Sequence, residues 1–356
     1  MHRLIILAHG GLGDVIMALP ALWAADSALG AGTQIEVITK GPIEGDLLGY
    51  IPWRSSVTWT PVGAGSKTSR ARSILTALLR MRRGKPSHFL PIHVHSRKAA
   101  QLFSLVCGAS RSVLPAAAND DLERTGVGPL AGEHKVEYIA RFFVRAGLIE
   151  PNQSLVFPPI ACPGSVAPPD GLRIIIAPMV GSPIEQHKKW PFERFVALGA
   201  MINRRFPNAS VELFGGPSEK PQLAALAESF ATRPCVKTPP TPSAAVADLS
   251  GADVLVSACG GATHLAALAG VPVVGIYGPT NPGHTGPYTT QLYPVRLGLR
   301  CSPCYRMAFI QGCGTPICMS LLPEESVIDA VEAALSRRPP PPRLWLPTTN
   351  ATAPVR

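Results

Sequence analysis

A carboxylate follows the first predicted strand of the chain, where it could take part in acid–base chemistry. The strand is expected over Leu4–Ala8 and leads into HGGLGD, His9 to Asp14. The glycines leave space for a ligand, and Asp14 begins the next predicted helix. A carboxylate there can take a proton from an attacking hydroxyl, or it can be a first-turn acid favoured by the helix dipole. Ile16 occupies the place of a third glycine, so the segment predicts no dinucleotide fingerprint.

Charged side chains with similar placement occur in the second half of the chain. Lys188 and Lys189 come shortly before a predicted helix that starts at Pro191. A lysine at such an edge can neutralise a diphosphate leaving group, although lysine pairs are also common on plain protein surfaces. Glu219 ends FGGPSE after a predicted strand. A carboxylate there can bind ribose hydroxyls, or it can be a first-turn helix acid.

The segment 252–282 reads as strand, glycine turn, helix, strand and glycine-proline loop. A strand over 253–257 leads into Gly260 and Gly261, and a short helix is expected over 263–269. Free N–H groups at a helix N-terminus and the helix dipole both favour an anion. The segment therefore predicts a nucleotide or diphosphate ligand in a parallel-sheet domain.

These segments are positioned by two alternating runs of predicted strands and helices. The first run has strands at 4–8, 34–39 and 88–95 and helices at 15–29, 69–82, 98–107 and 134–146. The second run has strands at 172–177, 210–214, 253–257 and 271–277 and helices at 191–205, 220–230, 263–269 and 324–336. We expect an N-terminal domain at 1–155, a proline-rich linker at 156–170, a C-terminal domain at 171–337 and a disordered proline-rich tail at 338–356. Alternation of this kind predicts two doubly wound parallel sheets that face a cleft.

Composition narrows the class of protein. The chain has 356 residues, 46% hydrophobic residues, 38 prolines and 33 glycines, which suits a two-domain α/β protein. No uninterrupted run of 18 apolar residues occurs, so no transmembrane helix is predicted. The apolar start, MHRLIILAHGG, is too short for a signal peptide and is interpreted as a first buried strand.

The formal net charge is +10, and much of the basic excess is local. Seven lysines and arginines fall between residues 67 and 85, with leucines and an isoleucine between them. This pattern fits an amphipathic basic helix that meets an anionic membrane surface. It fits equally well a solvated helix face that covers its own domain. No nucleic-acid recognition motif accompanies the charge, so nucleic acid is not expected as a partner.

Four of the eight cysteines are close together near the C-terminus, in the spacing C-x2-C-x8-C-x4-C: Cys301, Cys304, Cys313 and Cys318. The spacing allows a four-thiolate zinc site. Only one close C-x2-C pair is present, so we expect no metal and a structural role near the donor pocket. The scattered remaining cysteines favour a reduced, cytoplasmic protein over a disulfide scaffold.

Five segments in order give a family resemblance that covers roughly residues 3–334: GGLGDVIMALPAL, KKWPFERF, FGGPSE, GGATHLAALAGVPVVGIYGPTNP and CSPCYRMAFIQGCGTPICM. The chain resembles glycosyltransferase family 9, the heptosyltransferases of the lipopolysaccharide inner core. The resemblance implies the GT-B fold and an inverting transfer of a sugar from a nucleotide donor without a metal or other cofactor. It places the donor in the C-terminal domain and an anionic, lipid-linked glycan acceptor in the N-terminal domain. It also implies a cytoplasmic protein, peripheral to the inner membrane.

The resemblance also implies roles for individual residues. Asp14 matches the family's general base, with Gly11, Gly13 and His93 on the acceptor side. Lys188 matches the lysine that contacts the donor phosphates, and Glu219 matches the carboxylate that contacts the ribose. The remaining donor-site positions belong to the family's glycine turn: Cys259, Gly260, Gly261, Ala262 and His264.

The chain departs from the family at that turn. Cys259 and Gly260 stand where the family has an aspartate followed by serine or threonine, and a thiol is a weak hydrogen-bond partner. His93 likewise stands where members often carry an aspartate. The alternative interpretation is therefore a transferase fold that binds nucleotide as a scaffold and has lost turnover. A third interpretation, an epimerase of the same fold, has no support in the residues.

Overall fold

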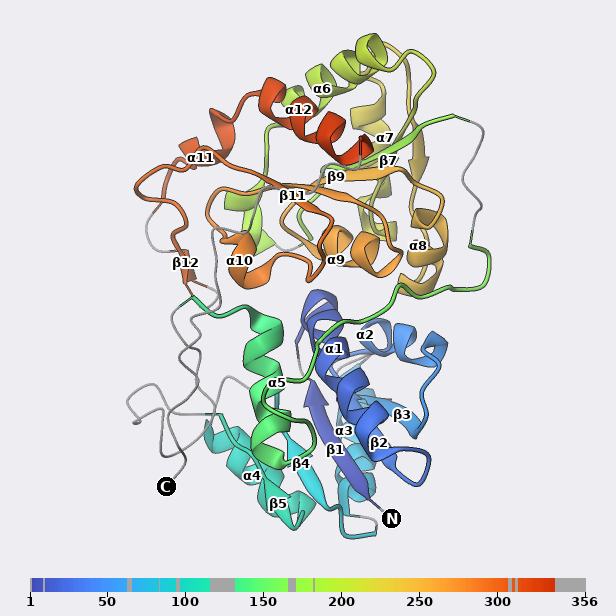
Figure 1. Ribbon diagram of the computed structural model, residues 1–356, viewed down its shortest axis with the longest axis vertical. Coiled ribbons are helices and arrows are strands. Elements are labelled where there is room, and N and C mark those ends of the chain that lie inside the picture. The colour runs from blue at the N-terminus through green and yellow to red at the C-terminus, as the bar shows by residue number, and fades with distance from the viewer. Residues whose placement is uncertain are drawn as a thin grey trace. The chain divides into compact units, whose positions relative to one another are not determined.

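The computed structural model describes residues 2–8, 10–62, 66–82, 84–93, 97–115, 132–165, 171–181, 183–306, 309–310 and 313–336. The chain divides into two compact units, Met1–Pro158 and Pro159–Arg356 (Figure 1). The predicted disordered tail, 338–356, and His9 lie outside the described residues. Each unit is a parallel sheet covered by helices, which is the two-domain α/β architecture that the sequence predicts.

The first unit has a five-stranded parallel sheet in the order β3-β2-β1-β4-β5. Its strands are β1 (Arg3–Ala8), β2 (Gln34–Thr39), β3 (Ser56–Pro61), β4 (His88–Leu90) and β5 (Arg111–Ser112). Its helices are α1 (Leu12–Leu29), α2 (Pro42–Asp46), η1 (Leu47–Tyr50), α3 (Lys67–Arg82), α4 (Arg97–Cys107) and α5 (Lys135–Ala146), where η marks a 3-10 helix. Helices α1 and α5 contact each other, and α3 packs against α4.

The second unit has a six-stranded parallel sheet in the order β11-β10-β9-β6-β7-β8. Its strands are β6 (Arg173–Ala177), β7 (Ser210–Phe214), β8 (Cys235–Lys237), β9 (Val254–Ala258), β10 (Val273–Ile276) and β11 (Leu292–Val295), and a separate antiparallel pair joins β12 (Tyr305–Arg306) to β13 (Phe309–Ile310). Its helices are η2 (Pro183–Lys188), α6 (Phe192–Arg205), η3 (Pro217–Glu219), α7 (Lys220–Ala227), α8 (Pro242–Leu249), α9 (Gly261–Leu268), α10 (Pro282–Thr285), α11 (Ile317–Ser320) and α12 (Glu324–Leu335).

The two sheets have the same strand order, counted from the first strand of each unit. In both, the second and third strands lie on one side of the first, and the fourth and following strands lie on the other. The order therefore reverses between β1 and β4 in the first unit and between β6 and β9 in the second. Ligands of doubly wound sheets bind at this switch point, beyond the carboxyl ends of the strands.

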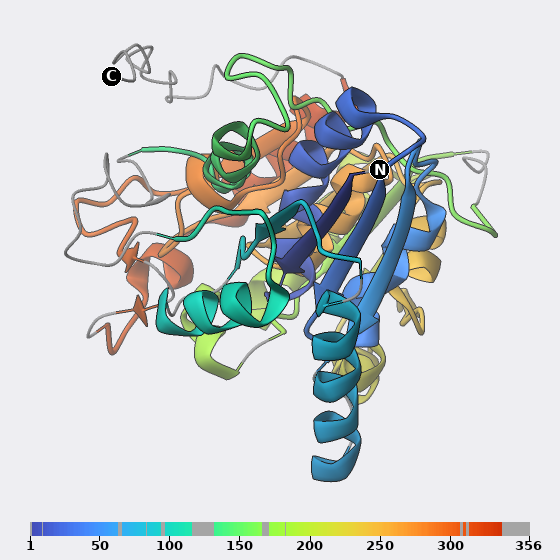
Figure 2. The same ribbon diagram turned by 90° about the horizontal axis from the view of Figure 1, so that it is seen from below.

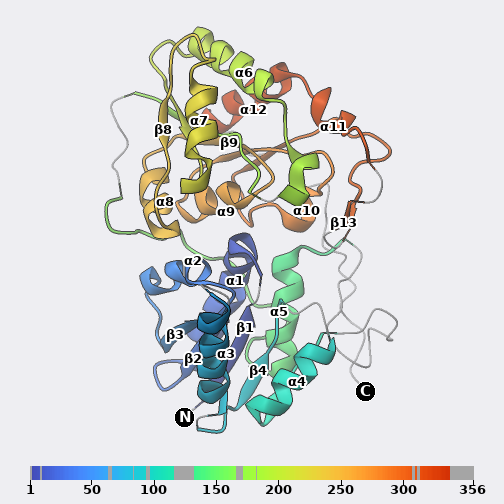
Figure 3. The ribbon, with the colours of Figure 1, turned by 180° about the vertical axis from the view of Figure 1, so that it is seen from behind.

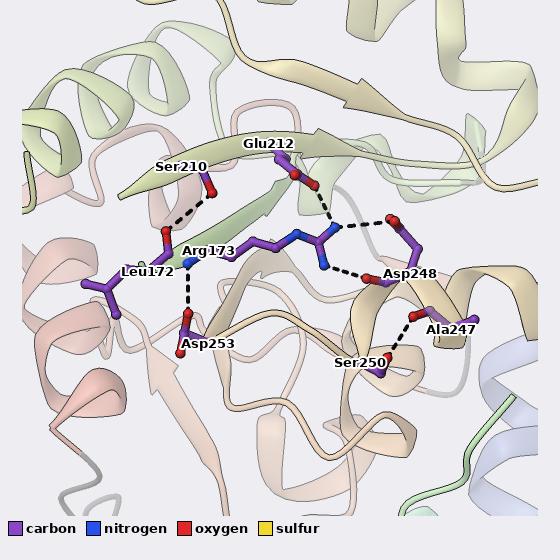
Figure 4. A network of polar contacts seen from close by, with 8 residues as sticks. All are labelled: Leu172, Arg173, Ser210, Glu212, Ala247, Asp248, Ser250 and Asp253. Atoms are coloured by element: carbon purple, nitrogen blue, oxygen red, sulfur yellow. Dashed lines mark hydrogen bonds and ion pairs between the residues drawn. The ribbon is translucent and has the colours of Figure 1, made fainter. Parts of the chain in front are cut away.

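In each unit, an arginine at the start of the first strand anchors the amino edge of the sheet. This edge is opposite to the carboxyl edge, where ligands of such sheets bind. Arg173 donates to Glu212 at 2.7 Å and to the backbone and side chain of Asp248, and its own N–H is bonded to Asp253 (Figure 4). Arg3 pairs with Glu36 in the first unit at 2.8 Å. In both units the glutamate lies opposite the residue two after the arginine, so the same device fixes the register of both sheets.

The core of the second unit forms around fully buried aliphatic strands and one tryptophan. Trp190 is 0% exposed and donates its indole N–H to the Leu322 carbonyl at 3.0 Å. Its ring meets the Phe195 ring edge-on, with the centroids 4.8 Å apart. This packing fixes the segment between β6 and α6, which carries the lysine pair.

Several predicted elements have different bounds in the structure, and three of these differences bear on the site or on helix length. The strand expected over 88–95 ends at Leu90, because Pro91 has no N–H to continue the ladder. The helix expected from residue 263 already begins at Gly261, with Gly260 as its extended N-cap. The helix expected over 220–230 ends at Ala227.

Helix α1 has the length and composition of a membrane span, but 61% of its apolar window is buried in the structure.

Candidate functional site

In the first unit, the turn between β1 and α1 holds the predicted base. The Gly11 N–H donates to Asp14 Oδ2 at 2.9 Å, so the carboxylate folds back over the start of its own helix. A Cβ on Gly10 would lie 2.4 Å from the Asp14 Cβ, which means that only glycine fits there. The Asp14 side chain is 28% exposed. The turn thus fixes the carboxylate and leaves part of it open to a substrate.

Lys135, the first residue of α5, forms an ion pair with Asp14 through its Nζ and the Oδ1 atom. Sequence reasoning missed this residue, since 121 positions separate the partners. One signal was available: a cation in the first turn of a helix is opposed by the helix dipole. A lysine in that position therefore indicates a nearby carboxylate.

The charges around Asp14 keep it ionised. Burial by itself would raise the pKa of Asp14, but Lys135, His93 and the Gly11 N–H outweigh it and hold the pKa far below its usual range. His93 follows β4, on the other side of the switch point from Asp14, and is 6% exposed. The structure thus brings Asp14, His93 and Gly11 together at the carboxyl edge of the first sheet. Gly13, half-buried, lies in the first turn of α1.

In the second unit, the two lysines of the pair have different surroundings. Lys188 ends η2 and is 6% exposed, whereas Lys189 is half-buried with its Nζ 5.4 Å from the centre of the Phe192 ring. A buried lysine is uncommon unless its charge has a partner or ligand. Lys188 lies in the connection from β6 to α6, which leaves the sheet at its carboxyl edge beside the switch point, as does the glycine turn after β9.

The glycine turn leaves the N-terminus of α9 open. Gly261 is exposed, and a Cβ added to it would meet no atom within 4 Å. The Thr263 hydroxyl caps the turn by donating to the Gly260 carbonyl at 2.7 Å. Ala262 is half-buried and His264 is 5% exposed. The space over Gly261 is what a phosphate needs in order to approach the free N–H groups of the helix.

Cys259 has no access to the solvent side of this turn. It is 5% exposed, and its Sγ lies 4.0 Å from the hydroxyl of Thr285 in α10. A thiol and a hydroxyl at that separation form at most a weak hydrogen bond. Cys259 therefore offers a donor sugar neither the charge nor the two oxygens of an aspartate.

Glu219 repeats the arrangement of Asp14 after a different strand. Its Oε2 accepts the Gly216 N–H at 2.7 Å, and a Cβ on Gly215 would lie 2.6 Å from that oxygen. Glu219 follows β7, which neighbours β6, and its side chain is half-buried. The turn fixes one carboxylate oxygen and leaves the carboxylate at the same edge of the sheet as Lys188.

Thr280, in the loop after β10, is a further polar group that sequence reasoning missed. It is 3% exposed, and within the described part of the chain its hydroxyl has no hydrogen-bond partner. A buried hydroxyl without a partner is costly. Thr280 follows β10, the neighbour of β9, so it lies at the same sheet edge as the glycine turn. This position makes it a candidate for a ligand contact. A hydroxyl directly after a buried strand was the available signal.

The cysteine segment packs against this same loop. The Ser302 hydroxyl donates to the Gly278 carbonyl, and the Cys304 N–H donates to the Pro279 carbonyl at 3.0 Å. A Cβ on Gly278 would lie 2.7 Å from the Cys318 Sγ. Among the residues that the structure describes, no group of three potential ligands is placed to hold a metal, and Cys301, Cys304, Cys313 and Cys318 are free thiols. These contacts hold the cysteine segment against the loop after β10.

Comparison with known proteins bears on the family and the fold. Residues 172–313 match the model of glycosyltransferase family 9 (heptosyltransferase). A glycosyl transferase family 9 structure from Veillonella parvula is similar at 19% identity and a TM-score of 0.73, covering 94% of this chain and 98% of that one. The E. coli heptosyltransferase WaaC with ADP is similar at 19% identity and a TM-score of 0.68, covering 93% and 99% of the two chains.

A third similar structure is the E. coli ADP-heptose lipopolysaccharide heptosyltransferase II, at 18% identity and a TM-score of 0.67, with 95% and 99% of the two chains covered. No curated protein sequence matches the chain. The identities are low, so these structures support the fold, and the family assignment comes from the sequence match in the second unit. The chain has the GT-B fold, and its second unit carries a heptosyltransferase-like domain of glycosyltransferase family 9.

Proposed function

We propose that the protein is an inverting glycosyltransferase that moves a heptose or a similar sugar from an ADP-linked donor to a lipopolysaccharide core or related cell-envelope glycan. One observation carries the proposal: the buried Lys188 and the open N-terminus of α9 share the switch-point edge of the sheet within the family-matched residues. A solved structure of similar fold holds ADP, which supports adenine as the base.

The donor end of the reaction needs a site for a departing diphosphate. As the bond from the anomeric carbon to the diphosphate oxygen breaks, positive charge builds on the sugar and negative charge on the phosphates. Lys188 and the free N–H groups at Gly261 and Ala262 can stabilise that negative charge. Glu219 is suited to the ribose hydroxyls. These groups belong to the chain itself, so we propose a transfer that requires no metal.

The acceptor end of the reaction needs a base. The acceptor hydroxyl oxygen forms a bond to the anomeric carbon on the face opposite the leaving group, so the configuration inverts, and its proton passes to Asp14. Asp14 is ionised and thus ready to accept the proton, but Lys135 holds one of its oxygens. We propose that the acceptor displaces Lys135 from Asp14, and that Lys135 then pairs with an anionic group of the acceptor.

The two units divide these roles in the proposal. The first unit binds an anionic, lipid-linked glycan through the edge that carries Asp14, and the second binds the nucleotide sugar. Eight cysteines without a disulfide among the described residues suit a reducing compartment, so we place the protein in the cytoplasm.

A second candidate function, a nucleotide-binding scaffold without turnover, rests on Cys259. The thiol is buried and cannot grip sugar hydroxyls as an aspartate would. Asp14, which is ionised and partly exposed, favours the enzyme over the scaffold, because nucleotide binding alone needs no general base in the first unit. The Cys259→Asp variant separates the two: a variant that still turns over no donor supports the scaffold.

The test is release of ADP from ADP-heptose, followed with and without a lipopolysaccharide-core acceptor. We expect release that depends on the acceptor, with loss of about a hundredfold or more in kcat for Asp14→Asn, since a general base contributes roughly that much. Binding of ADP to Asp14→Asn should stay at the wild-type level. Release that is equally fast in Asp14→Asn, or an epimerised sugar formed without acceptor, would contradict the proposal.

A further inference from the structure

Helix α3 carries two apolar rows on opposite sides. Ala77 and Met81 are 3% and 1% exposed and pack into the core of the first unit. Leu75 and Leu79 are 57% and 56% exposed. Residues four apart share a helix face, and residues two apart are about 200° around the axis, so the second row faces away from the core. The apolar residues within this basic helix are therefore not all used to cover its own domain.

Helix α4 shows the same division. Ala100 and Cys107 are 0% and 2% exposed and face inward, whereas Leu102 and Leu105 are 61% and 81% exposed. The thiol of Cys107 lies 3.9 Å from the Met81 carbonyl, and the two helices contact each other. Figures 2 and 3 show that both cover the same face of the first sheet. Their outward rows belong to one side of the unit, which we call the α3–α4 surface. Its apolar members are Leu75, Leu79, Leu102 and Leu105.

The charge around this surface has one sign. Residues 67–111 contain ten lysines and arginines and no aspartate or glutamate, as many positive charges as the formal net charge of +10 for the whole chain. Arg72, Arg82 and Lys98 are exposed. Arg72 precedes Leu75 by three positions and Arg82 follows Leu79 by three, so these arginines flank the outward leucine row.

These properties select one class of occupant. A second copy of the chain would bring the same positive charge to the contact. Nucleic acid would use the cations but would gain nothing from four exposed leucine side chains. An anionic lipid bilayer satisfies both features, because leucines enter the interface while arginines pair with the phosphate headgroups. We infer that the α3–α4 surface docks the protein on an anionic membrane. The inference extends the proposed function, whose acceptor is lipid-linked.

The test is sedimentation of the full chain with vesicles of phosphatidylglycerol and phosphatidylcholine, compared with phosphatidylcholine alone. We expect partitioning at least about tenfold stronger on the anionic vesicles and weaker at high salt, since headgroup attraction is screened within a Debye length. The double variant Leu75→Gln/Leu79→Gln should lose about tenfold in partitioning. Ile43→Gln is the matched control, because Ile43 is 57% exposed on α2 of the same unit, and it should bind as the wild type does.

Equal binding to both kinds of vesicle would overturn the inference, and so would equal losses in the double variant and in Ile43→Gln. Dimers in the absence of lipid that the double variant abolishes would also overturn it, in favour of self-association. Binding of ADP to the double variant, measured in parallel, should be unchanged and shows that the variant is folded. Vesicle binding without any nucleotide binding would refute the proposed function alone, so the two failures are distinguishable.

Discussion

At the residue scale, the ion pair between Lys135 and Asp14 decides how the candidate base behaves. The pair and the nearby His93 hold the pKa of Asp14 far below the roughly 3.9 of an unperturbed aspartate. Because the folded-state pKa is depressed, the pair stabilises the fold above about pH 4 and loses that effect only as the pH falls through the lower, folded-state value. Asp14 is therefore ionised throughout the neutral range.

We expect Lys135→Met to move the acidic limb of the pH profile of kcat/KM upward. Removal of the cation leaves burial as the largest influence on Asp14, and burial raises its pKa. The wild type should show no limb from this carboxylate above about pH 4. Lys135→Arg keeps the cation and should keep the wild-type profile. Identical profiles for Lys135→Met and the wild type would show that the pair does not control the base.

The same scale explains what the sequence could not reveal about the site. Asp14 and Glu219 each follow a strand within six residues, and Lys188 lies just before the W-P that precedes α6, so motif spacing was enough to select them. Lys135 and Thr280 acquire their meaning only from tertiary structure, since one pairs across 121 positions and the other is distinguished by burial without a partner. The local sequence gives a weak signal for each position but does not identify the partner or the burial.

At the element scale, the glycine turn before α9 is a preformed opening. Gly261→Ala should leave the free energy of unfolding within about 0.5 kcal/mol of the wild type, because the added Cβ meets no atom within 4 Å. It should weaken ADP binding by about tenfold, or about 1.4 kcal/mol, because the methyl group occupies the space that a phosphate needs. Thermal unfolding and ADP titration measure the two effects.

Gly314→Ala is the matched control, since a Cβ there also meets no atom within 4 Å and the residue lies in the same unit. This control should change neither quantity. If Gly261→Ala also left ADP binding unchanged, the phosphates would not approach α9.

Elements with strong apolar patterns were predictable, and weak or short ones were not. The strand predicted over 34–39 and the strand predicted over 210–214 have the bounds of β2 and β7. Strand β3 was missed because it lies at the sheet edge, where only alternate residues are partly covered. Strand β8 has three residues, and α8 is an eight-residue helix rich in alanine, too short for a helical period to be counted.

At the scale of the whole molecule, the two units are built on one plan. Both sheets have the same strand order, and both fix their amino edge with an arginine and a glutamate at equivalent register. The amino edge thus provides stability, and the carboxyl edge carries the polar groups of the site. Alternating strands and helices predicted the fold class, whereas the register and these ion pairs depend on long-range pairing that single-sequence patterns do not contain.

The most direct test of the donor site is the unfolding temperature of the whole protein with ADP, GDP, UDP and CDP. A ligand at one hundred times its Kd stabilises the native state by about 2.7 kcal/mol. We predict a rise with ADP that is retained in Lys189→Ala and lost or strongly reduced in Lys188→Ala, since only Lys188 is buried at the switch point. No rise with any nucleotide, or an equal rise in both variants, would contradict a donor site built around Lys188.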